Sequence, residues 1–191
     1  MDISVLPIII LLPLVLGTTL VSWLKQFSRG VTALAAIGIS LSSLVLLLLH
    51  APDVLNGQVI QQTWRWLPEL GLNLSFRLDA LGLLFALLIS GIGTLIFIYA
   101  YYYLGPKNSL SKLYMLLMLF MAAMLGIALS NNLILLLTFW ELTSISSFLL
   151  VGYWSNYDAA QRGSRMALTI TGMGGLGLLG GFILLGQITG T

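Results

Sequence analysis

The chain has 191 residues, of which 59% are hydrophobic and only 7% are charged, whereas an ordinary soluble domain is about 45 to 50% apolar and about 25% charged. Eight basic and six acidic side chains could not cover a water-exposed surface of this size, so the composition excludes a soluble protein. The absence of cysteine excludes disulfides and thiol chemistry, and a single histidine, His50, argues against haem and zinc sites. A net charge of +2 does not indicate nucleic-acid binding.

Six segments are long and apolar enough to cross a bilayer, which requires about 20 residues at about 1.5 Å per residue. The predicted spans are residues 4–24, 31–49, 78–104, 113–130, 132–154 and 166–188. The predicted fold class is therefore an all-α polytopic membrane protein with one membrane domain, residues 1–191. Because no basic residue precedes the first span, we expect a retained helix, kinked at Pro13, rather than a cleaved signal peptide.

The positions of the cations predict an orientation. Six of the eight Lys and Arg residues fall in the first, third and fifth loops, which lie on one side of the membrane: Lys25, Arg29, Lys107, Lys112, Arg162 and Arg165. Only Arg65 and Arg77 fall on the other side. By the positive-inside rule the N-terminus is outside and the basic loops are cytoplasmic. We expect Asp158, Arg162 and Arg165 to lie in a solvated loop with local salt bridges before the last span.

The polar stretch at residues 50–77 predicts a short hairpin outside the membrane. Apolar and polar residues alternate strictly from Leu72 to Asp79, which is the period of a half-buried strand. Residues 61–67 are the expected partner strand, across a turn that contains Pro68 and Gly71. Asp79, at the start of the third span, is expected to cap that helix.

One acidic residue, Glu141, is predicted near the middle of a span. A carboxylate there costs at least a few kcal/mol, so it should face the protein interior or internal water and is a candidate for proton transfer. Neighbouring hydroxyls form a candidate polar pathway: Thr138, Thr143, Ser144 and Ser147. The structural alternative is a protonated carboxyl that only hydrogen-bonds a neighbouring helix. No Lys, Arg or His of this chain is predicted at that depth, so a cationic partner would come from outside these residues.

The last predicted span is rich in glycine. Gly172, Gly174 and Gly177 form a G-x-G-x-x-G pattern, but no strand precedes it and the segment is an apolar helix, which argues against nucleotide binding. Gly177 and Gly181 form a G-x-x-x-G step, and Gly174, Gly175 and Gly180 widen the same smooth surface. We expect this surface to pack closely against another helix, from this chain or from a partner.

Residues 138–154, TFWELTSISSFLLVGYW, resemble the fifth-helix signature of the antiporter-like membrane subunits, and most of all the A-type subunit of the Mrp multisubunit Na⁺/H⁺ antiporters. Residues 78–94 and 174–181 resemble the third and sixth helices of that subunit. The wider superfamily includes the proton-pumping membrane subunits of respiratory NADH:quinone oxidoreductase. The resemblance covers the whole chain, which corresponds to the first six helices of a longer family member.

The resemblance implies a secondary antiporter, not an enzyme, that exchanges Na⁺ for H⁺ across a prokaryotic inner membrane together with other antiporter subunits and without a redox cofactor. In the family, the glutamate that matches Glu141 pairs with a lysine on the seventh helix. Two alternatives stay open. The chain could be a pumping subunit of a respiratory or hydrogenase-type complex, or a structural subunit without transport of its own.

Overall fold

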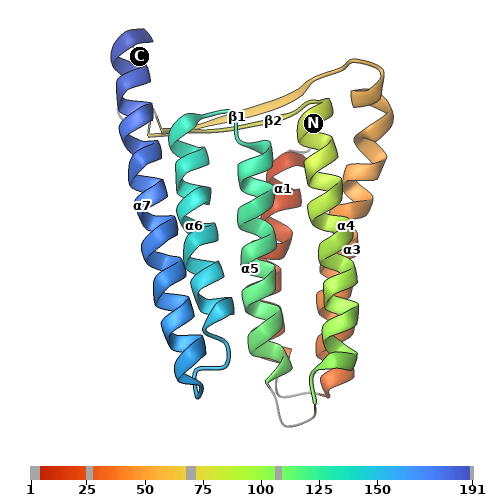
Figure 1. Cartoon of the computed structure of the whole chain (residues 1–191). Helices are drawn as coiled ribbons and strands as arrows, with labels where there is room; N and C mark the ends of the chain where they lie inside the picture. The colour runs from red at the N-terminus through yellow and green to blue at the C-terminus, as the bar shows by residue number, and fades with distance from the viewer. Residues whose placement is uncertain (1–4, 25–27, 68–71, 106–108, 190–191) are drawn as a thin grey trace.

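The computed structural model describes residues 5–24, 28–67, 72–105 and 109–189, which form a bundle of long helices with a two-stranded antiparallel sheet at one end (Figure 1). The helical elements are α1 (Val5–Leu11), η1 (Leu12–Gly17), α2 (Thr18–Trp23), α3 (Arg29–Leu55), α4 (Ala80–Tyr103), α5 (Leu110–Leu129), α6 (Leu133–Val151) and α7 (Asp158–Thr189). The strands are β1 (Ile60–Leu67) and β2 (Leu72–Leu78). The predicted fold class, helices with one hairpin, is confirmed.

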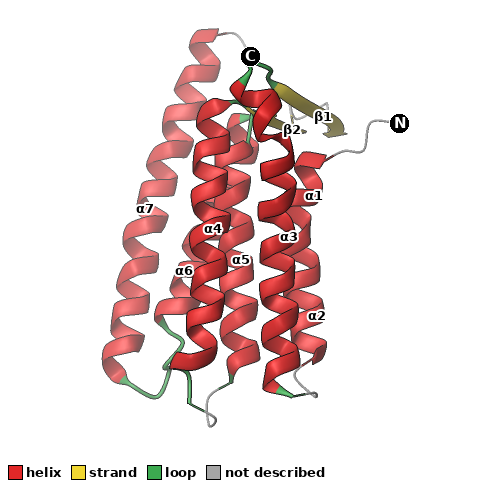
Figure 2. Cartoon of the chain, turned by 90° about the vertical axis from the view of Figure 1, so that its right-hand side faces the viewer, coloured by secondary structure: helices red, strands yellow, loops and turns green. Residues whose placement is uncertain are grey.

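Five of the helices, α3 to α7, are long and apolar enough to cross a membrane on their own. The first predicted span is a continuous helical run over residues 5–23, divided into α1, the π-helical segment η1 and α2. This run lies beside α3 and extends along the bundle (Figure 2), and it packs against both α3 and α5.

The π-helical segment coincides with Pro13, where the sequence predicted an irregular helix. Proline has no backbone N–H, so the carbonyl of Ile9, four residues earlier, loses its ordinary α-helical donor. The hydroxyl of Ser43 in α3 donates to that carbonyl at 3.2 Å, and both residues are fully buried. A side-chain bond thus satisfies a backbone group inside the bundle and joins the first helical run to α3.

Helix α5 is the central helix, packed against α3, α4, α6 and the first helical run. Its Tyr114 is fully buried and donates its hydroxyl to the Phe97 carbonyl of α4 at 2.8 Å. A second buried polar contact joins Ser40 of α3 to Thr94 of α4, with 2.8 Å between the two hydroxyl oxygens. Such bonds between helices fix their relative positions where lipid offers no alternative partner.

In the hairpin, the predicted alternation holds over Phe76, Arg77 and Leu78 but not at Ser75, which is buried although it is polar, with its hydroxyl oxygen 2.9 Å from that of Thr63. Phe76 and Leu78 of β2 are buried against the bundle, and Arg77 between them is exposed. The backbone N–H of Asn131 donates to the Ser75 carbonyl at 2.8 Å, which ties β2 to the residues before α6. The sheet therefore covers one end of the helices and contacts α1, α4, α5 and α6.

The ends of the hairpin region differ in part from the prediction. Helix α3 continues to Leu55 with Pro52 in its last turn, so β1 begins only at Ile60 and residues 50–55 are helical. The predicted turn at residues 68–71 lies outside the described residues. Asp79 caps α4 as expected, because its carboxylate accepts from the Gly82 N–H at 2.8 Å.

The predicted loop before the last span is wrong. Helix α7 begins at Asp158, so Asp158, Arg162 and Arg165 lie on its first turns. Hydropathy marks only the part of a helix that lies in hydrocarbon, whereas the backbone bonds continue into the polar layer. Asp158 in the first turn also interacts favourably with the positive end of the helix dipole.

Both ends of the described chain lie at the hairpin end of the bundle (Figures 1 and 2). The described cations Arg29, Lys112, Arg162 and Arg165 lie at the opposite end, where α3, α5 and α7 begin. The structure thus separates the basic end from the hairpin end, as the sequence predicted.

Candidate functional site

Helix α6 carries Glu141 and lies between α5 and α7 (Figure 1). The helix begins after Asn132, whose side-chain oxygen accepts from the N–H groups of Ile134 and Leu135 at 2.9 and 3.1 Å. Glu141 is eight residues from the first residue of α6, Leu133, and ten from its last, Val151, and is half-buried. The structure thus places this carboxylate midway along a span.

The Glu141 side chain lies against the backbone of Gly175 in α7. Gly175 is buried, and a β-carbon added there would overlap Oε1 of Glu141 and lie 2.9 Å from its Cδ. The carboxylate therefore fills the volume that any other residue at position 175 would need. The sequence indicated that glycine here permits close packing, but not that a carboxylate is what packs against it.

A second close contact fixes the other side of α6. A β-carbon on Gly126 of α5 would fall within the ring of Phe139. Residues two apart on a helix point in nearly opposite directions, since each residue turns the helix by about 100°. Phe139 therefore contacts α5 while Glu141 contacts α7. The Phe139 ring also lies 6.3 Å from the ring of Phe76 in β2.

The hydroxyls around Glu141 bond the backbone of α6. Thr138 donates to the Ile134 carbonyl at 2.9 Å, and Thr143 to the Trp140 carbonyl at 2.7 Å. Ser144 is buried and shares the Trp140 carbonyl at 3.3 Å. These hydroxyl oxygens keep their acceptor capacity for water. The predicted pathway along Thr138, Thr143, Ser144 and the half-buried Ser147 stays a prediction.

Within the described part of the chain, no donor hydrogen-bonds the Glu141 carboxylate and no cation forms an ion pair with it. The one ion pair there joins Arg77 Nε to Asp79 Oδ2 at 3.3 Å, at the hairpin end. No group of three or more His, Cys, Asp and Glu that could hold a metal occurs in the described ranges. The chemistry that Glu141 can perform from this position is the uptake and release of a proton.

The glycines that the sequence singled out for close packing, Gly175 apart, point away from α6. Gly174, Gly177 and Gly181 are exposed, and no atom outside the local helix lies within 4 Å of an added β-carbon at any of them. Of the glycines in the predicted smooth surface, Gly175 is the one that meets α6. The packing predicted for Gly174, Gly177 and Gly181 therefore does not occur within the described chain and stays a prediction about a partner.

Comparison with known families identifies the fold. Residues 64–114 match the family described as NADH-Ubiquinone oxidoreductase (complex I), chain 5 N-terminus. Residues 130–191, which include both Glu141 and Gly175, match the family described as NADH:quinone oxidoreductase/Mrp antiporter, TM. The chain belongs to this family. It is accordingly a multi-pass membrane protein, and the predicted resemblance is confirmed.

The related proteins are antiporter subunits by name. The chain is 41% identical over 182 residues to a Na(+)/H(+) antiporter subunit of Staphylococcus aureus. The aligned residues cover 95% of this chain and 23% of that protein. It is 42% identical over 188 residues to a "Probable K(+)/H(+) antiporter" subunit of Rhizobium meliloti (strain 1021), covering 98% of this chain and 19% of that protein. The chain thus spans about a fifth of the length of these relatives.

Solved structures show the same helix arrangement. The Mrp complex of Dietzia sp. superposes with a TM-score of 0.74 at 27% identity, over 98% of this chain and 19% of that chain. An archaeal respiratory membrane complex, the membrane-bound sulfane sulfur reductase, gives a TM-score of 0.83 at 22% identity, over 98% of this chain and 28% of that chain. The second likeness shows the fold alone.

Proposed function

We propose that this chain is part of a multisubunit secondary antiporter that exchanges Na⁺ for H⁺ across the membrane, with Glu141 in the proton pathway. The observation that carries the proposal is the position of Glu141, a carboxylate held at mid-span between α6 and α7, in a chain 41% identical to a Na(+)/H(+) antiporter subunit. In this scheme the chain is a transporter component that uses no redox cofactor.

The partners are the other antiporter subunits and the bilayer. An approaching cation favours the charged form of a carboxylate over its protonated form. Since no described cation of this chain reaches Glu141, we propose that the cation lies on a helix outside these residues. Movement of that cation would then make Glu141 release a proton or take one up.

For the location, we propose the inner membrane of a prokaryotic cell, with the N-terminus outside and the basic loops in the cytoplasm. The support is the six-to-two distribution of cations. The chain has no cysteine, so single cysteines can be introduced at the exposed positions Gln58, beside the hairpin, and Asn156, between α6 and α7. A membrane-impermeant maleimide added to intact cells should label the Gln58→Cys variant only. Labelling of Asn156→Cys alone would reverse the orientation.

Everted vesicles that contain the complete assembly test the function. An imposed pH gradient is followed with a fluorescent dye, and NaCl or KCl is added. We expect Na⁺ to collapse the gradient, and a response to K⁺ alone would change the proposed cation. Dependence on NADH or hydrogen oxidation instead of on an added cation would indicate a respiratory pump. No response to either, in vesicles with the assembly intact, would indicate a structural subunit.

A further inference from the structure

At the basic end of the bundle, α5, α6 and α7 enclose a pocket of about 370 Å³. It lies more than a full helical turn from Glu141, and the proposed transport reaction does not use it. Its lining combines two cations, Lys112 of α5 and Arg165 of α7, with apolar side chains further along the helices, among them Phe148 and Leu149 of α6.

Part of the pocket lining comes from the end of α6, the start of α7 and the residues that connect them. A β-carbon on Gly152 would lie 3.3 Å from the Ser164 hydroxyl, so the end of α6 approaches the start of α7 closely there. The buried Ser164 donates to the Gln161 carbonyl at 3.0 Å, and the Gln161 side-chain amide donates to the Ser155 carbonyl at 2.7 Å. These bonds hold the connection between α6 and α7 against the first turns of α7.

The two cations have no anionic partner in the described ranges of the chain. Neither Lys112 nor Arg165 forms an ion pair there, and both side chains are exposed. Lys112 Nζ lies 5.8 Å from the centre of the Tyr153 ring, within the range of a cation–π contact. Asp158, in the first turn of α7, does not line the pocket. The pocket therefore presents net positive charge.

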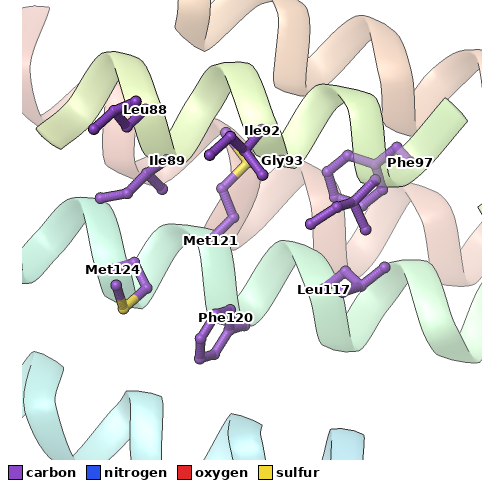
Figure 3. Close-up of a pocket in the computed structure, with 10 residues that line it drawn as sticks. Leu88, Ile89, Ile92, Gly93, Phe97, Leu117, Phe120, Met121 and Met124 are labelled. Carbon is purple, nitrogen blue, oxygen red and sulfur yellow. The ribbon is translucent and has the colours of Figure 1, made fainter. Parts of the chain in front are cut away.

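A second pocket, between α4 and α5, has no charged residue in its lining and serves as a comparison for the pocket at the basic end. Its volume is about 210 Å³, and its lining is entirely apolar (Figure 3), with Leu88, Ile92, Phe97, Leu117 and Phe120 among the lining side chains. With no charge or hydrogen-bond donor among its side chains, it cannot select a polar group. The pocket at the basic end offers both cations and an apolar wall.

We propose that the pocket between α5, α6 and α7 binds an anionic phospholipid. Lys112 and Arg165 contact the headgroup phosphate, and an acyl chain lies along Phe148 and Leu149. Arg and Lys form strong charge-assisted hydrogen bonds to phosphate, and basic pockets between membrane helices are suited to anionic headgroups. The position fits, because the pocket lies at the end of the spans, where headgroups occur, and its apolar wall continues toward the middle of the membrane.

Native mass spectrometry of the intact assembly, purified and exchanged into defined lipid, tests this proposal. The probes are dioleoylphosphatidylglycerol, dioleoylphosphatidylcholine and inorganic phosphate. We expect the wild-type protein to retain phosphatidylglycerol in preference to phosphatidylcholine. Lys112→Gln combined with Arg165→Gln should lower that preference by roughly thirtyfold, from the usual contribution of each juxtamembrane cation. The charge-conserving pair Lys112→Arg and Arg165→Lys should retain it, which controls for folding.

Arg162→Gln is the matched single control for Arg165→Gln, since both residues lie at the start of α7 and Arg162 does not line the pocket. We expect Arg165→Gln alone to weaken phosphatidylglycerol retention and Arg162→Gln to leave it unchanged. Equal effects of the two variants would show a general surface charge and overturn the site. Displacement of the lipid by millimolar inorganic phosphate would show a site for free anions and overturn the proposed lipid.

Discussion

The carboxylate of Glu141 in α6 occupies the space beside Gly175 in α7 in which a β-carbon at position 175 would lie. The two residues are thirty-four positions apart in the sequence and meet midway along α6. Each therefore limits the other. The carboxylate can reach α7 only if residue 175 has no side chain, and residue 175 can change only if the carboxylate moves.

Substitution of Gly175 is the first test of this relationship. Gly175→Ala should displace the Glu141 carboxylate and reduce cation/proton exchange several-fold in vesicles, whereas Gly172→Ala, with nothing within 4 Å of the added β-carbon, should leave exchange unchanged. Combining Gly175→Ala with Glu141→Asp shortens the acidic side chain and should restore part of the exchange lost in Gly175→Ala. Equal activity of Gly175→Ala and wild type would show that the contact does not position the carboxylate.

The contact between α5 and α6 makes a prediction about stability. Gly126→Ala would place a methyl group within the Phe139 ring, and overpacking of this kind costs about 1 to 3 kcal/mol. The free energy of unfolding in detergent should fall by that amount. Phe139→Leu should relieve the clash, so the double variant should be more stable than Gly126→Ala alone. A loss of stability in the double variant equal to the sum of the losses in the two single variants would contradict the packing of Phe139 against Gly126.

The bond between Ser43 and the Ile9 carbonyl makes a second prediction about stability. Ser43→Ala removes the donor that reaches this buried carbonyl across the bundle. The cost should be about 1 kcal/mol, which is typical of a lost hydrogen bond with a buried acceptor. Ser42→Ala is the matched control, because Ser42 donates only to the Ile39 carbonyl of its own helix. A loss of stability in Ser42→Ala as large as that in Ser43→Ala would contradict a specific role for Ser43.

The exposed glycines of α7 make a prediction about assembly. Gly177→Leu or Gly181→Leu should reduce the amount of complete assembly recovered from membranes, because a close helix contact needs small residues. Gly38→Leu on the exposed side of α3, where an added β-carbon also meets nothing within 4 Å, is the control. Unchanged recovery of all three variants, measured by co-purification of the other subunits, would leave these glycines facing lipid.

The sequence predicted those parts of the fold that depend on local physics. Runs of apolar residues located the spans, and the alternation from Leu72 to Asp79 located β2. Asp79 was identified as the cap of α4 because a short acidic side chain preceded an apolar run. The start of α7 was missed because the residues from Asp158 to Arg165 are polar and give no hydropathy signal, although they are helical.

The site was predicted only in part, because contacts between helices depend on how each helix is rotated about its axis. Glu141 was identified from its depth in the span and from the resemblance of residues 138–154 to the antiporter-like subunits. Several glycines of α7 were equally good candidates for a close contact, and the sequence could not show that Gly175 is the one that faces α6. The sequence predicted a polar pathway along the hydroxyls near Glu141, and the structure shows that the hydroxyls of Thr138, Thr143 and Ser144 donate to backbone carbonyls of α6.

The measurement that tests the central claim most directly is Na⁺/H⁺ exchange by the complete assembly with Glu141→Gln, which keeps the size of the side chain and removes its titration. The control is Asp53→Asn, an exposed carboxylate at the end of α3. We predict that both variants assemble normally, that Asp53→Asn exchanges at the wild-type rate, and that Glu141→Gln falls to the background of vesicles without the assembly. Wild-type exchange by a fully assembled Glu141→Gln variant would make Glu141 a packing residue and contradict its role in proton transfer.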